Sequence, residues 1–334
     1  MRDLQAVDSL LLKELKSCCA KECNFLPREA GLKLIESSSV ENCRAVSSKC
    51  RDSRVEELWG LTSFFGYSTQ TFVHAVNFLD RFLTVMKVQP KHLPCIGVCC
   101  LHIAAKMVED DSNVSPIHEL IRISQSKFTV PDLCRMEKIV MEKLGVKPEA
   151  VTPLTFLHLL YSAFTSWSVE REELPSIESL EAQLKACLCR LVFSKAKPSV
   201  LALSLFAQEF DTHQSSKLMR ILHALQGYLK ISDGELLHWK QHVAKCMTEY
   251  CSTECNKPNN KKLVWIISKK TAQNLQCSHY SVPGLPTIPE GSWDESESED
   301  FCEDMSSGED SPWGSPGSDG EGAFFPSKFL QSMK

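Results

Sequence analysis

A segment in the middle of the chain, residues 94–108, constrains the fold most because it is apolar on nearly every side. Its aliphatic residues are Ile96, Val98, Leu101 and Ile103, and its small residues are Cys95, Gly97, Cys99, Cys100, Ala104 and Ala105. A helix that is apolar all round must be buried, and small side chains let neighbouring backbones approach it closely. The sequence therefore predicts a central helix with other helices packed around it.

The residues on both sides of this segment also show helical periodicity. From 71 to 86 the apolar side chains fall on one helical face, and Ser68 or Thr69 can cap its start. A similar stripe runs from 131 to 144 and stops at Gly145. Further helices are expected near residues 10–15, 180–191, 200–206, 214–229 and 233–248. No alternation of strands with helices supports a parallel sheet, so the predicted fold is all-α.

The charged residues divide the chain into a mildly basic body and a strongly acidic tail. The whole chain has 37 Lys and Arg against 42 Asp and Glu, a net charge of −5. Twelve of the acidic residues and no basic one fall between Glu290 and Glu321, which leaves residues 1–289 with a net charge of +5. From about Ser281 the chain is also rich in Pro, Ser and Gly, so it cannot bury enough apolar surface to fold. We therefore expect a disordered acidic tail.

The sixteen cysteines indicate reduced thiols rather than disulfides or a metal centre. Many lie within apolar segments, and no secretory signal pattern opens the chain, so disulfides are disfavoured. The nearest approach to a metal cluster is His242 with Cys246, Cys251 and Cys255, but this spacing fits no zinc signature. No stretch reaches the roughly 18 to 20 uncharged apolar residues that span a bilayer. We therefore expect no metal, no cofactor and no membrane span, in a protein of the cytoplasm and nucleus.

Residues 71–83, Thr-Phe-Val-His-Ala-Val-Asn-Phe-Leu-Asp-Arg-Phe-Leu, carry a specific family pattern. The core Ala-Val-Asn-x-x-Asp-Arg-Phe-Leu resembles the second helix of a cyclin box. Lys106 and the run Arg-Met-Glu at 135–137 fall where the cyclin pattern expects them. Further segments that resemble the G-type cyclins are residues 64–66, 121–125, 180–187 and 193–203. The match covers roughly residues 50–290, and the acidic tail resembles that of the longer G-type members, so the chain is identified as a member of this family.

The resemblance implies a tandem cyclin fold, in which two five-helix repeats each surround a central apolar helix. We expect the first cyclin box at residues 50–147 and a second cyclin-like repeat at residues 148–255. An N-terminal extension with one helix, residues 1–49, precedes them, and serines at 37–39 and 47–48 indicate loops. A basic extension, residues 256–280, and the disordered acidic tail, residues 281–334, follow.

The resemblance also implies a regulatory subunit rather than an enzyme, and the sequence holds no glycine-rich phosphate loop and no nucleophile elbow. In the family, a Lys–Glu pair on the first repeat contacts a protein kinase near its movable helix. Such contacts can set the geometry that phosphoryl transfer needs inside the kinase. Here the pair maps onto Lys106 and Glu137. The residues alone leave a second interpretation, an internal salt bridge between the two.

The family pattern also places an Arg beside the Asp of the Asp-Arg-Phe-Leu run, as a buried structural pair. The counterparts here are Arg51 and Asp80, with Arg54 as the competing arginine. Residues 50–54, Cys-Arg-Asp-Ser-Arg, replace the Met-Arg-Ala-Ile-Leu groove with which cell-cycle cyclins dock substrates, and Pro94 replaces a Gln below it. We therefore do not expect substrates to dock through this groove. A separate departure follows Lys106, where Met-Val-Glu-Asp replaces the Phe-Glu-Glu that the family often carries, and it concerns the kinase contact.

Residues 285–290, Leu-Pro-Thr-Ile-Pro-Glu, fit the pattern Leu-x-x-Ile-x-Glu, which the B-prime regulatory subunits of protein phosphatase two-A bind. Leu285 and Ile288 can fill apolar pockets, and Glu290 can meet a basic one. The prolines favour an extended chain that loses little entropy on binding. Phosphorylation of Thr287 would add charge suited to a basic cluster. The alternative is a chance match of three fixed positions.

Four further serines make the tail a candidate phosphorylation and turnover segment. Ser296 and Ser307 each have an acidic residue three positions on, and Ser311 and Ser315 each precede a proline. A tail that only improves solubility is the alternative.

The sequence thus predicts a non-catalytic cell-cycle regulator that binds a cyclin-dependent-type protein kinase, protein phosphatase two-A, or both, and that restrains division. One alternative is a phosphatase-targeting scaffold without kinase activation. Another is a cyclin-fold nucleic-acid binder, suggested by a basic cluster with one aromatic residue, namely Lys257, Lys261, Lys262, Lys269 and Lys270 with Trp265. A body charge of +5 is mild for nucleic-acid binding, so a solvated face is favoured there.

Overall fold

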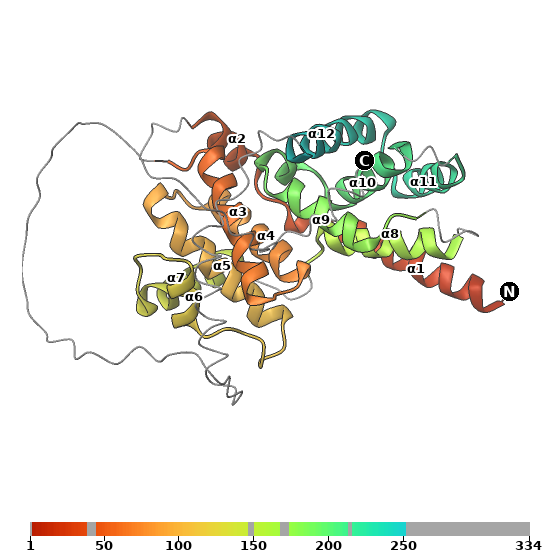
Figure 1. Cartoon of the computed structure of the whole chain (residues 1–334). Coiled ribbons are helices and arrows are strands. Elements are labelled where there is room, and N and C mark those ends of the chain that lie inside the picture. Colours follow the sequence, from red (N-terminus) through yellow and green to blue (C-terminus); the bar gives the residue numbers. More distant parts are fainter. Residues whose placement is uncertain (1, 39–44, 146–149, 168–173, 213–215, 252–334) are drawn as a thin grey trace, which may run out of the picture. The chain divides into compact units, whose positions relative to one another are not determined.

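All regular structure in the described part of the chain is helical, and no strand is present there (Figure 1). The computed structural model describes residues 2–38, 45–145, 150–167, 174–212 and 216–251. The helices are α1 (Arg2–Glu22), α2 (Glu29–Ser37), α3 (Ser48–Phe65), α4 (Thr69–Val85), α5 (Leu93–Val108), α6 (Ile117–Ile123), α7 (Val130–Leu144), α8 (Pro153–Trp167), α9 (Ile177–Leu188), α10 (Pro198–Thr212), α11 (Ser216–Leu229) and α12 (Asp233–Cys251). Short 3-10 helices are η1 (Cys23–Phe25), η2 (Pro90–His92) and η4 (Leu191–Lys195). The predicted all-α fold is confirmed.

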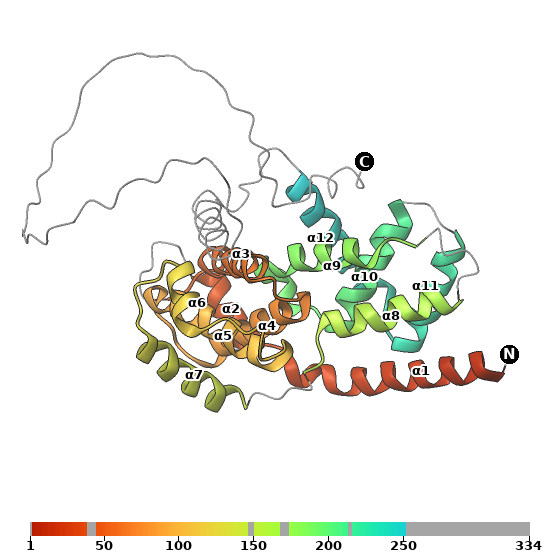
Figure 2. The same ribbon diagram turned by 60° about the horizontal axis from the view of Figure 1, so that its bottom comes forward.

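Two sets of five helices, α3–α7 and α8–α12, each surround one buried helix. In the first set, α5 packs against α3, α4, α6 and α7, and it is buried from Cys95 to Ala105. In the second, α10 packs against α8, α9, α11 and α12, and it is buried from Pro198 to Ala207. Figure 2 shows both sets, with α1 running alongside α8. The tandem five-helix fold and the central helix at residues 94–108 are therefore confirmed.

Side-chain caps determine where α4 and α7 begin and end. The hydroxyl of Ser68 accepts a hydrogen bond from the backbone N–H of Thr71 at the start of α4. Thr129 and Asp132 cap each other reciprocally at the start of α7, and Gly145 ends this helix with a left-handed φ of 53°. The capping position at Ser68 and the stop at Gly145 agree with the sequence signals.

The region before residue 50 differs from the prediction of one helix followed by serine loops. A second helix, α2, packs against α4, and Ser37 is its last residue. Ser47 caps α3 by accepting a backbone hydrogen bond at 3.4 Å, so Ser48 is already helical. The contact of α2 with α4 needs a glycine, because a Cβ at Gly31 would lie 2.5 Å from the Cα of Thr84. A short helix held by such tertiary contact leaves little signal in the periodicity.

By length and mean hydropathy alone, residues 90–108 could cross a membrane, and 61% of this stretch is buried inside the protein. The stretch comprises η2 and α5, and α3, α4 and α7 pack against α5. Its position at the centre of the first repeat accounts for its apolar character.

Candidate functional site

Lys106 and Glu137, the residues expected to meet a kinase, form an ion pair on the first repeat. Lys106 lies in the last turn of α5 and Glu137 in the middle of α7, and Lys106 Nζ donates a hydrogen bond to Glu137 Oε1. Their side chains are 43% and 21% exposed, respectively. A pair this accessible to water contributes about 0–1 kcal/mol to folding. The internal salt bridge is thus present, and it is weak enough to open for a partner.

Glu137 shares the outward side of α7 with exposed apolar residues. Val130 is 39% exposed, Met141 is 41% exposed, and Cys134 between them is also exposed. At about 100° per residue, positions 130, 134, 137 and 141 fall on one side of the helix. The residues that α7 buries are Leu133, Val140 and Leu144. We call Val130, Cys134, Glu137 and Met141 the α7 face; it is an exposed apolar stripe interrupted by one ion pair.

Glu109, three residues beyond Lys106, holds the start of α4. Its carboxylate accepts hydrogen bonds from the backbone N–H and the hydroxyl of Ser68, both at 2.8 Å, and from the hydroxyl of Thr71. Burial acts to raise the pKa of Glu109, but the hydrogen bonds from Thr71 and Ser68 outweigh it and lower the pKa. The carboxylate after Lys106 is therefore committed to capping a helix in this chain.

Arg51 and Asp80 form a buried bidentate pair between α3 and α4. Arg51 Nε donates to Asp80 Oδ1 at 2.8 Å, and Nη2 donates to Oδ2 at 2.7 Å. Burial acts to lower the pKa of Arg51, but the negative charge of Asp80 outweighs it and raises the pKa. Arg54, the competing arginine, forms an ion pair with Glu57 instead. The structure thus brings Arg51, not Arg54, to Asp80.

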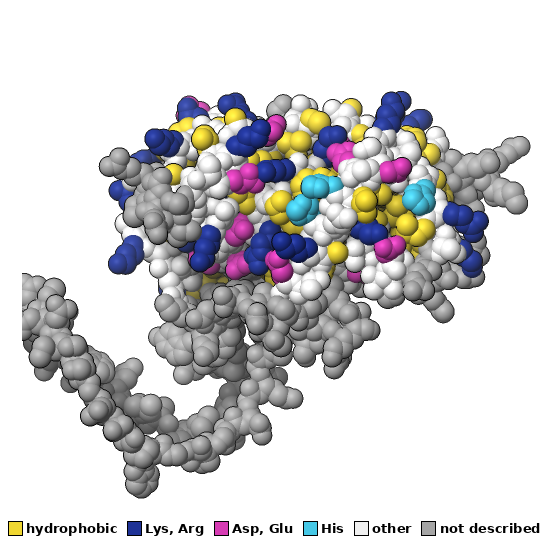
Figure 3. Space-filling model, turned by 90° about the horizontal axis from the view of Figure 1, so that it is seen from above, with side chains coloured by type: hydrophobic (Ala, Val, Ile, Leu, Met, Phe, Trp, Pro, Cys, Tyr) yellow, Lys and Arg dark blue, Asp and Glu magenta, His cyan; other side chains and the backbone are white. Residues whose placement is uncertain are grey.

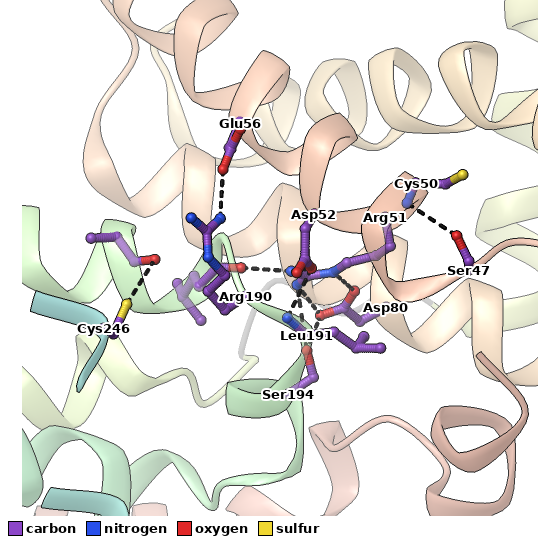
Figure 4. Close-up of polar contacts among 12 residues, drawn as sticks. Ser47, Cys50, Arg51, Asp52, Glu56, Asp80, Arg190, Leu191, Ser194 and Cys246 are labelled. Atoms are coloured by element: carbon purple, nitrogen blue, oxygen red, sulfur yellow. Dashed lines mark hydrogen bonds and ion pairs between the residues drawn. The ribbon is translucent and has the colours of Figure 1, made fainter. Parts of the chain in front are cut away.

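The Arg51–Asp80 pair also joins the first repeat to the second (Figure 4). Arg51 Nη1 donates to the carbonyl oxygen of Leu188 at 2.9 Å. The hydroxyl of Ser194 donates to Asp80 Oδ2 at 2.6 Å. Both acceptors of Asp80 are therefore occupied, and the guanidinium group of Arg51 bonds to both repeats.

Two neighbouring contacts reach the same part of the second repeat. Asp52 Oδ1 accepts a hydrogen bond from the backbone N–H of Leu191 at 2.8 Å, and Arg190 Nη1 donates to Glu56 Oε1 at 2.5 Å. Burial raises the pKa of Asp52, although the charge of Arg51 opposes the shift. We define the inter-repeat clamp as Arg51, Asp52, Glu56, Asp80, Arg190 and Ser194. Sequence analysis missed its second-repeat members because 114 or more residues separate them from their partners.

A groove of about 1210 Å³ lies between α3, the start of α5, and α7. Ser53 and Arg54, which stand where the family's docking run has Ile and Leu, line it together with Lys91 and Pro94. The stem of Arg54 lies over Gly97, where an added Cβ would come within 2.9 Å of Arg54 Cδ. At positions 53 and 54 the groove therefore presents a polar and a charged side chain, and apolar residues line it elsewhere, namely Leu61, Ile123, Phe128, Met136 and Ile139.

The predicted sites beyond residue 251 lie outside the described residues. They are Leu285, Thr287, Ile288, Glu290, Ser296, Ser307, Ser311 and Ser315, with the basic cluster Lys257, Lys261, Lys262, Lys269, Lys270 and Trp265. Cys255 of the histidine–cysteine cluster also lies outside. Its member Cys246 is buried, and the Cys246 thiol donates to the carbonyl oxygen of Ala186 at 3.8 Å. Within the described ranges, no group of three or more His, Cys, Asp or Glu side chains could hold a metal ion.

Comparisons of fold and sequence define the class of the protein. The cyclin N-terminal domain family matches residues 17–147. The X-ray structure of a viral cyclin from herpesvirus saimiri matches with a TM-score of 0.57 and 22% identity, and the match covers 72% of this chain and 99% of the viral one. At this level of identity the likeness shows a shared cyclin fold.

Relatives that match over most of the length place the chain more closely. Cyclin-G2 of Homo sapiens is 54% identical over 316 residues, which cover 94% of this chain and 92% of the relative. Cyclin-G1 of Homo sapiens is 48% identical over 281 residues, which cover 84% of this chain and 95% of the relative. The chain therefore belongs to the cyclin family, and within it to the G-type cyclins. This confirms the resemblance found in the sequence and gives the chain a cyclin-type regulatory role.

Proposed function

We propose that the first repeat binds a cyclin-dependent-type protein kinase through the α7 face and the Lys106–Glu137 pair, and that the chain acts as a non-catalytic subunit. The observation that carries the proposal is a partly exposed ion pair within an exposed apolar stripe. Protein interfaces combine an apolar centre with charged groups that fix the register of the partners. Membership of the cyclin family supports a kinase as the partner.

The free-energy changes expected at the α7 face favour binding of a kinase. Opening the Lys106–Glu137 pair costs about 0–1 kcal/mol, so both charges can turn to groups on a kinase. Covering Val130 and Met141 would remove apolar surface from water, which contributes about 25 cal/mol per Å². A kinase is active only when its own Lys–Glu pair is in place. A helical face packed against the movable helix of the kinase can hold that pair.

Affinity purification of the full-length chain from cells tests the kinase interface. We expect the double variant Lys106→Ala/Glu137→Ala and the single variant Met141→Glu to lose the co-purified kinase. The matched control is Glu29→Ala/Lys33→Ala, which removes an exposed ion pair of 2.7 Å from α2, and this variant should retain the kinase. Equal recovery of the kinase from all four proteins would rule out the α7 face as its binding site.

We infer a second partner, a B-prime regulatory subunit of protein phosphatase two-A, from the tail motif at residues 285–290. The support is the Leu-x-x-Ile-x-Glu pattern, its prolines and the acidic run that follows. The variant Leu285→Ala/Ile288→Ala should lose the phosphatase in the same purification. Phe324→Ala/Phe325→Ala removes two apolar residues elsewhere in the tail and serves as the control. Undiminished phosphatase recovery with the motif variant would show that the match arises by chance.

The two sets of variants also separate a kinase regulator from a phosphatase-targeting scaffold. Motif-dependent phosphatase recovery with no kinase in the wild-type sample would identify the scaffold.

In either case we propose that the protein acts in the cytoplasm and nucleus and restrains cell division. Expression of the wild type should then slow the rise in cell number, and the Leu285→Ala/Ile288→Ala variant should not. Equal growth of cells expressing either protein would contradict restraint through the phosphatase.

A further inference from the structure

Two histidines stand one turn apart on the outer side of α12. The ring centroids of His238 and His242 lie 4.6 Å apart, and the ring planes are inclined by 74°. His238 is exposed and His242 is half-buried. Figure 3 shows histidine side chains on the face seen from above, among hydrophobic and charged ones. Side chains at positions i and i+4 of a helix project from the same side, so both imidazoles can reach one small ligand.

Aromatic neighbours restrict the rotation of both histidine rings. The ring of Trp239 lies 5.1 Å from that of His238 and 5.6 Å from that of His242. Phe193, from η4, meets His242 edge-on at 6.4 Å and Trp239 at 6.1 Å. The indole of Trp239 is itself buried. Phe193 thus limits the rotation of the His242 ring, and the indole of Trp239 borders both imidazoles.

Charged side chains surround His242, since Glu36, Arg190, Lys245 and Glu249 line the same hollow. Lys245 repels a cation, but Glu249 lies 4.0 Å from its ammonium group and partly offsets this charge.

We propose that His238 and His242 form a binding site for a divalent transition-metal ion of the zinc type. Imidazole nitrogen is a preferred ligand of this class of ion, and two histidines one helical turn apart can chelate it. The described part of the chain places no third ligand in the same cluster, so water would have to complete the coordination of a bound ion. The site differs from the histidine–cysteine cluster considered in the sequence, because the thiol of Cys246 turns inward to the carbonyl oxygen of Ala186.

A metal ion at this position would bind only the folded chain, since the two imidazoles come together only when α12 is helical. Any ligand of this kind raises the free energy of unfolding by mass action. Because α12 packs against α9 and α10, the added stability belongs to the second repeat as a whole. The site thus gives two independent signals, the number of ions bound and the rise in melting temperature.

Titration of the full-length chain with Zn²⁺, followed by calorimetry and by thermal unfolding, tests the site. The wild type should bind one more Zn²⁺ than the His238→Ala and His242→Ala variants, or bind it about tenfold or more tightly. Zn²⁺ should also raise the melting temperature of the wild type more than theirs. The control is His223→Ala, which removes an exposed histidine of α11 that bonds to Gln226 at 3.2 Å and has Met219 and Gly227, not a second histidine, four residues away. This control should match the wild type.

Equal Zn²⁺ binding by the wild type and both α12 variants would overturn the proposal. So would a loss of Zn²⁺ binding in His223→Ala as large as that in the α12 variants. His238 is exposed, so its replacement removes one ring beside Trp239 but leaves the contact of Trp239 with Phe193 in place. Should His242→Ala perturb the far-ultraviolet circular dichroism, His238→Ala alone decides the question.

Discussion

Two ion pairs of the first repeat, Arg51–Asp80 and Lys106–Glu137, share their chemistry and differ in their surroundings. Arg51 is fully buried and Asp80 nearly so, whereas water reaches both Lys106 and Glu137. In a buried pair, loss of one partner leaves a charge without water or counter-charge. In an exposed pair, water replaces the lost partner. Burial therefore decides whether such a pair holds the fold together or remains available to another protein.

The largest expected effect comes from removing one half of the buried pair. Asp80→Ala should lower the free energy of unfolding by about 3 kcal/mol, because the buried guanidinium group of Arg51 loses its bidentate partner and keeps only Asp52, at 3.1 Å, as a counter-charge. Urea unfolding followed by circular dichroism measures this loss. In an Arg51→Met background the same substitution should cost clearly less. An identical loss in both backgrounds would show that the two residues are not coupled.

A smaller loss is expected where the clamp reaches the second repeat. Ser194→Ala removes the hydroxyl that donates to Asp80 Oδ2 at 2.6 Å, and a hydrogen bond to a charged group contributes about 1.5–3 kcal/mol. The control is Ser162→Ala on α8, whose exposed hydroxyl donates only to the carbonyl oxygen of His158. This control should stay within about 0.5 kcal/mol of the wild type. Similar unfolding midpoints for the two variants would contradict a stabilising role of Ser194.

For the exposed pair, Lys106–Glu137, we expect a small effect on stability and a larger effect on kinase binding. Lys106→Ala or Glu137→Ala should change the free energy of unfolding by about 0–1 kcal/mol. The same variants should weaken kinase binding by more than about 1 kcal/mol, if both charges contact the kinase. Urea unfolding and calorimetric titration with the co-purified kinase measure the two quantities. A stability loss as large as that of Asp80→Ala would instead assign the pair to the fold.

The smallest effect is a dependence on pH, which should differ in sign between Asp52 and Glu109. The pKa of Asp52 is raised in the folded chain, so its stabilising contribution is present at low pH and is lost as the pH rises through the folded pKa. The pKa of Glu109 is lowered, so its contribution is present above the unfolded pKa and is lost as the pH falls through the folded one.

Urea unfolding at a series of pH values, from about 3 to 7, separates these two contributions. Relative to the wild type, Asp52→Asn should make the free energy of unfolding rise more steeply with pH, and Glu109→Gln should make it rise less steeply. Changes of the same sign in both variants would contradict the assigned directions of the two pKa shifts.

The fold could be predicted from the sequence where the pattern is long and local. The stripes of α4 and α7 and the apolar α5 extend over four or more turns, and cap residues mark their ends. The helix α2 has nine residues, and it depends on the approach of Gly31 to Thr84, which no local pattern records. Short helices that are stabilised by distant contacts are therefore not detected from the periodicity of apolar residues.

The residues of the candidate site also fall into those that the sequence could predict and those that it could not. Lys106, Glu137, Arg51 and Asp80 fall on positions of a family pattern, so each could be named before the structure was known. Ser194 and Arg190 bond to residues more than a hundred positions away, and nothing in their immediate sequence marks them. The histidine pair on α12, His238 and His242, could be predicted only in part. The sequence shows that the two residues are four positions apart, but it does not show the aromatic rings that pack against them.

Gly97 leaves room for Arg54 at the edge of the groove, so these two positions should vary together during evolution. An added Cβ there would meet Cδ and Cγ of Arg54 at 2.9 and 3.1 Å, so a larger residue would push the guanidinium group and its bond to Glu57 out of place. Conversely, Arg54→Leu alone would leave the space over Gly97 partly unfilled. A variant with apolar side chains at this edge of the groove would therefore need coordinated changes on α3 and α5, and one substitution would not suffice.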